Sequence, residues 1–282
     1  VCFVGEPGAP GGEWVLVDAG VPGSAGTIMM HAERLFGARS APRAIVLTHG
    51  HFDHVGGLQK LLERWDVPVY AHRLEVPYLS GRSSYPPPDP SVGGGMMARL
   101  SPVYPRGPID IGANLEVLPE GGEIPPLPEW RWIHTPGHTA GHVSLFRESD
   151  RALVSGDAVI TVNQESAYDV IRQRREIHGP PAYFTQDWEQ SRRSLGRIEA
   201  LLPDILISGH GQPLVGEEVR NGISRLLVNY REEVVPSQGR YVGTPALADE
   251  RGVVAVPPKR GGSAALPVVL ALAAVAAAVG GA

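Results

Sequence analysis

The sequence predicts a layered α/β architecture in which buried strands alternate with amphipathic helices. Short apolar runs recur along the chain, and several are followed, after a brief turn, by segments whose apolar residues repeat at helical spacing. This alternation is typical of sheets covered by helices. The length of 282 residues and the hydrophobic content of 43% are enough for one large core. We therefore expect one main domain, residues 1–240, followed by a tail, residues 241–282.

The N-terminal part of the chain supplies the first alternation. Strands are expected where apolar residues cluster, and helices where apolar residues recur every three or four positions. Ser24 is a suitable N-cap for the first helix, whose apolar pattern stops at Gly37. In order, the expected elements are strands at 1–4 and 14–17, a helix at 24–36, a strand at 44–47, a helix at 55–65 and a strand at 68–71.

Residues 80–108 interrupt this alternation with a run of three prolines, a run of three glycines and further residues of both types. A long segment of this composition is a loop rather than a helix or strand. It also carries Tyr85, Met96, Met97 and Tyr104, which would be costly to leave in water. We therefore expect a flap beside a functional site, in preference to a surface decoration.

The second half of the chain returns to short strands and ends in two helices. The strands are short apolar runs bounded by glycine, proline or charged residues, and the helices show apolar residues on one face. The expected strands are 115–118, 130–134, 143–146, 152–155 and 205–207, and the expected helices are 188–201 and 217–232.

The C-terminal tail contains an apolar segment, residues 264–279, that follows the basic pair Lys259-Arg260. The segment is slightly shorter than the roughly 17 residues that a bilayer span needs, and it is rich in alanine. Two interpretations therefore stay open. In one the tail associates with a membrane, and in the other it forms an ordinary helix that docks on the domain or on a partner.

Charge and cysteine content limit the functional class. The formal net charge of -5 gives no basic field to hold nucleic acid, so we expect a small-molecule substrate instead. The single cysteine, Cys2, excludes an internal disulfide, so we expect either a reducing compartment or a fold that needs no disulfide. No signal peptide is visible, and we expect a cytoplasmic protein, with membrane association through the tail as the alternative. The sequence carries no signal for the oligomeric state.

The segment 48–54 places three histidines and one aspartate directly after the apolar run 44–47. One exposed histidine usually faces water, but four such groups in one turn would repel each other or be wasted without a cation. Imidazole nitrogen and carboxylate oxygen suit zinc, and also iron or manganese. The loop therefore predicts a metal site. Its candidate ligands are His49, His51, Asp53 and His54.

Three later segments offer further ligands. His138 lies in a Pro-Gly turn, where glycine lets the backbone present the ring without steric cost. Asp157 and His210 each follow an apolar run that ends in glycine, so a sheet edge would deliver both to one crevice. His134 and His142 flank His138, and for them we expect structural hydrogen bonds rather than metal ligation.

The order of these motifs resembles the metallo-β-lactamase fold superfamily, whose hallmark is a Thr-His-x-His-x-Asp-His loop followed by a histidine, an aspartate and a final histidine. The resemblance covers about residues 1–235 and implies an α+β fold, a four-layer αβ/βα sandwich with a binuclear site at one edge. Within the superfamily, Asp53 and the turn at 134–139 look like the glyoxalase II and lactonase-like branches, in a poorly characterised bacterial subgroup. The chain departs from both branches, because His210 and Asp157 are not followed by the tyrosines usual there.

The resemblance implies a metal-dependent hydrolase with two divalent ions, expected to be zinc, with iron or manganese as alternatives. A hydroxide that bridges the two ions would attack an ester, thioester or lactone, with Asp53 and Asp157 as the catalytic carboxylates. The first ion would be held by His49, His51 and His138, the second by Asp53, His54 and His210, and Asp157 would bridge them. The expected substrate contacts are His178, Tyr183, Phe184 and Trp188.

Two rival functions stay open at this point. Similar folds hold a single iron at the first site and oxidise persulfides, and these ligand types do not choose zinc over iron. The other rival is a metal-binding module without catalysis. Metal analysis together with a panel of substrate classes separates the three.

Overall fold

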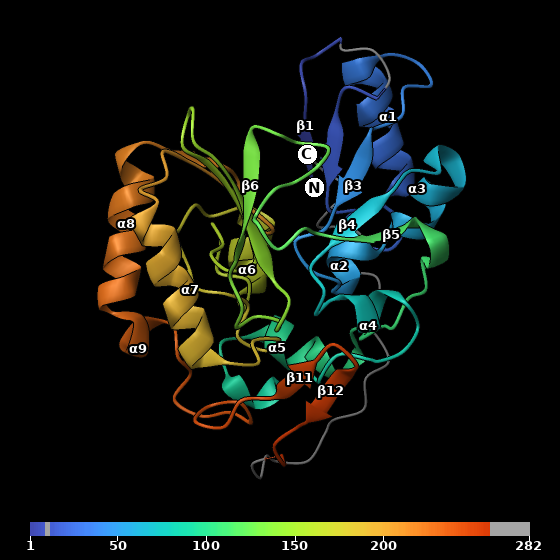
Figure 1. Cartoon of the computed structure of the whole chain (residues 1–282). Coiled ribbons are helices and arrows are strands. Elements are labelled where there is room, and N and C mark those ends of the chain that lie inside the picture. The colour runs from blue at the N-terminus through green and yellow to red at the C-terminus, as the bar shows by residue number, and fades with distance from the viewer. Residues whose placement is uncertain (9–11, 260–282) are drawn as a thin grey trace.

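Two five-stranded sheets face each other, and helices cover the outer face of each sheet (Figure 1). This arrangement confirms the four-layer αβ/βα sandwich. It is seen in a computed structural model that describes residues 1–8 and 12–259. The apolar segment predicted at 264–279 lies outside the described residues. No helix within the described ranges is long and apolar enough to cross a bilayer.

The first sheet is parallel except at one edge. Its strands, in spatial order, are β1 (Cys2–Val4), β2 (Val15–Val17), β3 (Ala44–Val46), β4 (Val69–Ala71) and β5 (Leu115–Val117). Only β1 is antiparallel to its neighbour, and β2, β3, β4 and β5 run in the same direction. The carboxyl ends of these four strands therefore lie at one edge of the sheet.

The second sheet is mixed. Its strands, in spatial order, are β10 (Leu214–Val215), β9 (Ile205–Ser208), β8 (Ala152–Gly156), β7 (Val143–Arg147) and β6 (Trp130–His134). The one parallel pair is β8 with β9, so their carboxyl ends share an edge. The antiparallel β7 begins at that edge, because it runs opposite to β8.

Alternating side chains on the inner strands pack into different layers, which is why β2 and β3 are fully buried and contain no polar residue. On β2, Leu16 packs toward the helices while Val15 and Val17 pack between the sheets. On β8, Leu153 packs toward the helices and Val154 between the sheets. Burial on both faces removes the usual alternation of apolar and polar residues.

The outer helices use one apolar face each. Helices α1 (Ala25–Phe36) and α3 (Leu58–Trp65) cover the first sheet, and α7 (Trp188–Ala200) and α8 (Glu217–Val228) cover the second. Ser24 precedes α1 as predicted, but its hydroxyl donates to the carbonyl of Ala19 and does not cap the helix. In α7 the cap is Asp187, whose carboxylate accepts the backbone N–H of Gln190.

The helix predicted at 55–65 is wrong in its extent. The structure has a short helix α2 (Phe52–Val55), then a break at Gly56-Gly57, then α3. At the break the backbone N–H groups of Gly56 and Gly57 donate to Gly20 and Ala19, and a Cβ at Gly56 would overlap the backbone nitrogen of Pro22. This close approach of the 18–22 turn divides the helix. The helix predicted at 217–232 is also divided, into α8 and α9 (Tyr230–Glu233).

The predicted flap, residues 80–108, follows the short helix α4 (Val76–Leu79) and contains α5 (Met96–Leu100). The flap also contains two 3-10 turns, η1 (Pro90–Val92) and η2 (Ser101–Val103). A third such turn, η3 (Gly112–Asn114), follows the flap, and helix α6 (Ala167–Arg172) lies between β8 and α7. Residues 247–255 of the predicted tail form a hairpin, β11 (Leu247–Asp249) and β12 (Gly252–Ala255).

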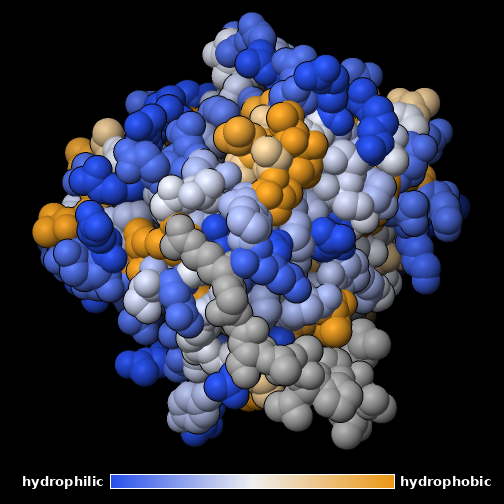
Figure 2. All heavy atoms as spheres, turned by 90° about the horizontal axis from the view of Figure 1, so that it is seen from below, coloured by the Kyte–Doolittle hydropathy of each residue, from blue (hydrophilic) through white to orange (hydrophobic). Residues whose placement is uncertain are grey.

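The hairpin contacts the start of the flap, where the N–H of Val253 donates to the hydroxyl of Ser83 at 3.2 Å. Flap and hairpin lie at the lower end of the molecule in Figure 1. Seen from below, this end is mainly hydrophilic, with a compact hydrophobic patch (Figure 2). The flap and the first part of the tail therefore cover the same end of the sandwich.

Candidate metal centre

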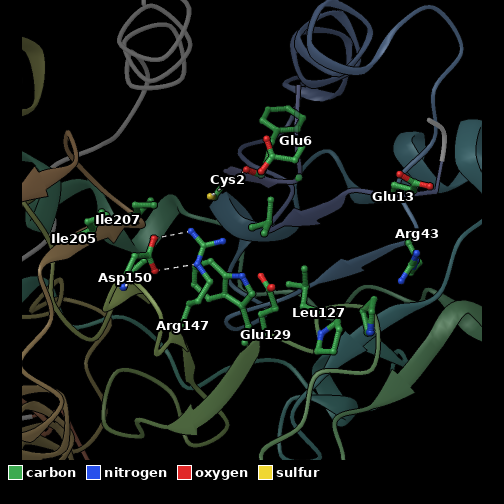
Figure 3. Close-up of a pocket in the computed structure, with 17 residues that line it drawn as sticks. Cys2, Glu6, Glu13, Arg43, Leu127, Glu129, Arg147, Asp150, Ile205 and Ile207 are labelled. Atoms are coloured by element: carbon green, nitrogen blue, oxygen red, sulfur yellow. Dashed lines mark hydrogen bonds and ion pairs between the residues drawn. The ribbon is translucent and has the colours of Figure 1, made fainter. Parts of the chain in front are cut away.

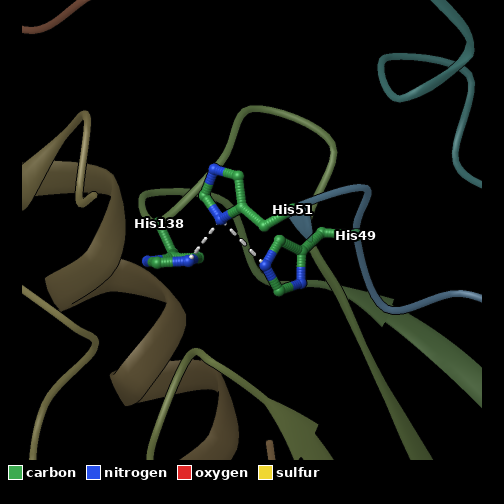
Figure 4. Close-up of side chains that lie close together, drawn as sticks. All are labelled: His49, His51 and His138. Atoms are coloured by element: carbon green, nitrogen blue, oxygen red, sulfur yellow. Dashed lines mark hydrogen bonds between the residues drawn. The ribbon is translucent and has the colours of Figure 1, made fainter. Parts of the chain in front are cut away.

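Three imidazoles from loops at the strand ends of the two sheets lie close together. The Nδ1 atom of His51 lies 3.0 Å from Nε2 of His49 and 2.9 Å from Nε2 of His138, and the three side chains are buried (Figure 4). His49 and His51 leave the end of β3, and His138 lies in the loop between β6 and β7. The structure thus brings the sequence-predicted ligands of the first site together.

Burial keeps these three imidazoles neutral. Loss of water is the largest effect, and it lowers the pKa of His51 to about 4 and holds the pKa values of His49 and His138 well below the usual value. Each neutral ring has one nitrogen lone pair to offer. Three such nitrogens facing one point fit a divalent cation that prefers nitrogen ligands.

The second predicted set surrounds Asp157. The Oδ2 atom of Asp157 lies 3.2 Å from Nε2 of His210 and 3.4 Å from Nε2 of His138, and its Oδ1 atom lies 3.3 Å from Nε2 of His54. Asp53 joins this group, because its Oδ2 atom lies 3.4 Å from Nε2 of His210. One carboxylate therefore contacts members of both sets.

The fit of a cation is clearest at atoms that lack a partner. Nε2 of His54 and Oδ1 of Asp157 are fully buried and form no hydrogen bond, although they lie close together. Buried polar atoms are normally paired, so both point to a group that binds them jointly. A metal ion among these nitrogen and oxygen atoms is the simplest such group.

Charge gives the same indication. Burial alone would lower the pKa of His210, but the charge of Asp157 and hydrogen bonds to Asp157 and Asp53 raise it to about 9. Burial would raise the pKa of Asp157, yet the charges of His210 and His54 hold it well below its usual range. Asp157 and Asp53 are therefore stabilised by nearby positive charge, which either protons on the histidines or divalent cations can supply.

Further hydrogen bonds orient the ligands. Asp18, at the end of β2, accepts from Nδ1 of His54 at 2.8 Å and from both the hydroxyl and the N–H of Thr48 at 2.8 Å. Asp18 was not among the site residues predicted from the sequence. The available signal was its position directly after a buried strand, in an Asp-Ala-Gly turn.

The two histidines expected to be structural have that role. Nε2 of His134 bonds the carbonyl of Ala140 at 2.8 Å, and Nε2 of His142 accepts the backbone N–H of Asp157 at 2.9 Å. His142 thereby holds the backbone that presents Asp157.

A second missed residue is Glu75, which follows β4 and contacts the two loops that carry the three-histidine set. Its side chain is fully buried and accepts hydrogen bonds from Gly50, Tyr85, Thr139 and Gly141. Burial raises the pKa of Glu75, and these four hydrogen bonds oppose that effect. An acidic residue before a short helix gave no sign of this role in the sequence.

The predicted substrate contacts fall into two groups. The ring of Phe184 lies 4.6 Å from that of His51, and Tyr183 packs on Phe184. Phe184 and Tyr183 form an aromatic cluster beside the centre, together with Phe52 of α2 and with Tyr104, which lies in the flap. His178 pairs with Ile160, and Trp188 packs in the core between the second sheet and its helices. All four substrate contacts stay predictions.

Two cavities lie away from the predicted metal ligands. One, of about 520 Å³, is lined by β1, β9 and the segment 126–130, and it contains the ion pair between Arg147 and Asp150 (Figure 3). The other, of about 870 Å³, lies between α7, α8 and residues 241–245. Neither is lined by a predicted metal ligand.

Comparison with known proteins agrees with this geometry. The family model of the metallo-beta-lactamase superfamily matches residues 3–210. The chain is 50% identical, over 226 residues, to the probable metallo-hydrolase YflN of Bacillus subtilis (strain 168), and the match covers 80% of this chain and 85% of that protein. It is 33% identical to a hydroxyacylglutathione hydrolase of Xylella fastidiosa (strain M23), over 55% of this chain and 44% of that one.

Among solved structures, the BLEG-1 B3 metallo-beta-lactamase is similar in fold. Its TM-score is 0.53 and its sequence identity 24%, and the match covers 80% of this chain and 97% of that one. This likeness supports the fold alone.

Proposed function

The chain belongs to the metallo-β-lactamase superfamily and is a metal-dependent hydrolase, and we propose that it uses two divalent metal ions to hydrolyse an ester, thioester or lactone. The observation that carries this proposal is the position of Asp157. One of its oxygens contacts His138 of the three-histidine set as well as His210 of the second set. A carboxylate shared in this way suits a pair of ions better than a single ion.

The residues that would hold the two ions are those predicted from the sequence. His49, His51 and His138 would bind the first, Asp53, His54 and His210 would bind the second, and Asp157 would contact both. The mixture of imidazole and carboxylate suits zinc, and iron and manganese also accept these ligands. When bound, such ions polarise a carbonyl group and make water acidic enough to act as a nucleophile near neutral pH.

Asp53 can accept a hydrogen bond from water as an ionised carboxylate. Burial alone would raise its pKa, but a hydrogen bond from His210 and nearby charges lower it to about 2, so the carboxylate is ionised at neutral pH. Its side chain is 16% exposed, whereas that of Asp157 is 3% exposed. We propose that Asp53 orients the attacking water or relays its proton toward the leaving group.

Substrate would approach from the side of Asp53 and His210, because these are the partly exposed members of the centre. The aromatic cluster of Phe52, Tyr104 and Phe184 borders the neighbouring His51. Aromatic walls favour an apolar acyl group over a highly charged one. The relative named hydroxyacylglutathione hydrolase supports including acylated glutathione in the substrate panel.

The test is metal quantification and a substrate panel on one preparation. We expect two ions per chain and turnover of esters, thioesters or lactones. Asp157→Ala should reduce the metal content to one ion or none and abolish turnover, since the shared carboxylate is lost. Asp150→Ala, which changes a surface carboxylate paired with Arg147, is the matched control and should keep both.

Three outcomes would contradict the proposal. An Asp157→Ala variant that keeps two ions and full turnover would remove the role of the shared carboxylate. One iron per chain, with oxygen uptake on a persulfide and no hydrolysis, would indicate the oxidoreductase. Full metal occupancy without turnover on any substrate class would indicate a binding module.

A further inference from the structure

Glu75 connects two loops that are distant in sequence. Its Oε2 atom accepts the backbone N–H of Gly50 at 3.0 Å, and its Oε1 atom accepts the hydroxyl of Thr139 at 2.7 Å and the N–H of Gly141 at 3.0 Å. Gly50 lies between His49 and His51, and Thr139 directly follows His138. Each carboxylate oxygen therefore serves one of the two loops that carry the three-histidine set.

The two loops pack directly against this carboxylate. A Cβ at Gly141 would lie 2.7 Å from Oε1 and 2.8 Å from the backbone nitrogen of Glu75. A Cβ at Gly50 would lie 2.7 Å from the hydroxyl of Tyr85. Such approaches are closer than a side chain tolerates, so both positions suit glycine. The spacing between the loops is thus set by contact with Glu75 and Tyr85.

Tyr85 brings the flap into the same network. Its hydroxyl donates to Oε2 of Glu75 and accepts the N–H of Gly50 at 2.9 Å. Its ring stacks on Tyr78, with centroids 3.8 Å apart, and lies 4.5 Å from the ring of His51. The first residues of the flap are therefore fixed relative to the three histidines.

All four donors to Glu75 are neutral, and the carboxylate is fully buried. A buried carboxylate is costly unless its hydrogen bonds are complete. Hydrogen bonds to an ionised acceptor are also stronger than those between neutral groups. This arrangement favours one loop spacing strongly over others.

We propose that Glu75 is a positioning residue that fixes the distance between the two loops carrying His49, His51 and His138, and so sets the metal affinity of this set. Tyr85 extends the same control to the flap. The inference rests on the proposed function only in taking these three histidines as metal ligands. It does not depend on which substrate is hydrolysed.

The test replaces the carboxylate by an amide of the same shape. In Glu75→Gln the amide NH₂ must face the donors of one loop or the other, so the hydrogen bonds to that loop are lost. We expect metal binding to the metal-free protein to weaken by about 10- to 100-fold, as for other groups that orient ligands. Competition with a chromophoric chelator measures this with zinc, and the visible spectrum of the cobalt-loaded protein reports the ligand geometry, without substrate. Glu120→Gln, at an exposed carboxylate, is the control.

Wild-type affinity and an unchanged cobalt spectrum in Glu75→Gln would overturn the proposal. If that variant does not fold, Tyr85→Phe and Thr139→Val decide, because each removes a single donor. Weaker metal binding in either variant supports the positioning role of Glu75, and wild-type affinity in both overturns it. Because these measurements need no turnover, an inactive wild type that still binds metal would leave this inference standing while the proposed hydrolysis failed.

Discussion

At the scale of single residues, each candidate ligand is held by a partner that is not itself a ligand. Asp18 orients His54, and His142 holds the backbone of Asp157. Such outer hydrogen bonds fix the ring orientation and the tautomer of a ligand. The metal affinity of the centre therefore depends on residues outside the motif.

Asp18→Asn tests this dependence. The NH₂ of the amide faces either the N–H of Thr48 or the pair formed by the Thr48 hydroxyl and Nδ1 of His54, so one side of this network is lost. Any acceptor left for His54 is then a neutral amide oxygen, which holds the ring less strongly. We predict about 10- to 100-fold weaker binding of the second metal equivalent, measured by titration of the metal-free protein. Thr48→Ser keeps the hydroxyl and should change the affinity less. Equal affinities in wild type and Asp18→Asn would refute the role given to Asp18.

A second residue-scale prediction concerns His72 of the segment after β4. Its ring stacks on His134 at 4.4 Å, and burial, followed by the charges of His134 and Arg73, lowers its pKa to about 3. The unfolded chain takes up a proton below the usual pKa of about 6.5, while the folded chain resists protonation down to about pH 3. Stability should therefore fall as the pH falls through this window, by at most about 1.4 kcal/mol per pH unit.

Urea unfolding of the metal-free protein between pH 6.5 and 4.5 measures this slope, with a chelator present throughout. His72→Asn should give a smaller decrease in the free energy of unfolding than wild type over that range. His31→Asn, on α1, is the control and should keep the wild-type slope. Parallel pH profiles for wild type and His72→Asn would show that the stacked pair does not contribute.

The sequence predicted the candidate ligands far better than their supporting residues. The loop 48–54 concentrates four metal-binding groups within one turn, so the signal is local. Asp18 and Glu75 are single carboxylates. Asp18 bonds Thr48, which lies 30 residues away, and Glu75 bonds Gly141, which lies 66 residues away. Only the fold brings these residues together, so no local pattern indicates them.

At the scale of elements, the strands were predicted best where a continuous apolar run is buried on both faces, as in β2 and β3. The short strands β10, β11 and β12 were not predicted. The helices were predicted less accurately where tertiary contacts divide them. The apolar pattern of 55–65 continues through Gly56, and the pattern alone does not show that the 18–22 turn packs against that glycine. The short helices of the flap were not predicted, because the proline and glycine residues around them interrupt the apolar periodicity.

Gly56→Ala tests the cause of this division. The added Cβ would meet backbone atoms of Val21 and Pro22, which cannot move without displacing the turn that carries Asp18. We predict destabilisation of about 1–3 kcal/mol by urea unfolding, as for other overpacked sites. Gly196→Ala, in α7, meets no atom within 4 Å and should instead stabilise by about 0.5–1 kcal/mol. A neutral Gly56→Ala would show that the break has another cause.

At the scale of the whole molecule, the centre joins the two halves of the sandwich. His49, His51, Asp53 and His54 follow a strand of the first sheet, whereas His138, Asp157 and His210 come from the second sheet. The convergence follows from strand ends that share one edge. The residues alone predicted layers and strand ends, and the family resemblance supplied the pairing of the two sheets, because strand order is not encoded in local patterns.

Metal removal should therefore loosen the contact between the halves. We predict that chelation lowers the Tm of the loaded protein on the order of 10 °C, since ligand binding at about 1,000 times Kd contributes about 4 kcal/mol. Differential scanning calorimetry with and without chelator measures the shift. Asp157→Ala should show a much smaller shift, because it binds less metal. An unchanged wild-type Tm would mean that the ions do not hold the halves together.

The most direct test of the two-ion centre is the stoichiometry of metal binding to the metal-free protein. Zinc titrated into the apoprotein by calorimetry should bind with two equivalents per chain, and hydrolysis should reach its maximum as the second equivalent binds. His210→Ala should lose the second equivalent and keep the first. Saturation at one equivalent in the wild type, with full hydrolytic activity at that point, would contradict the account.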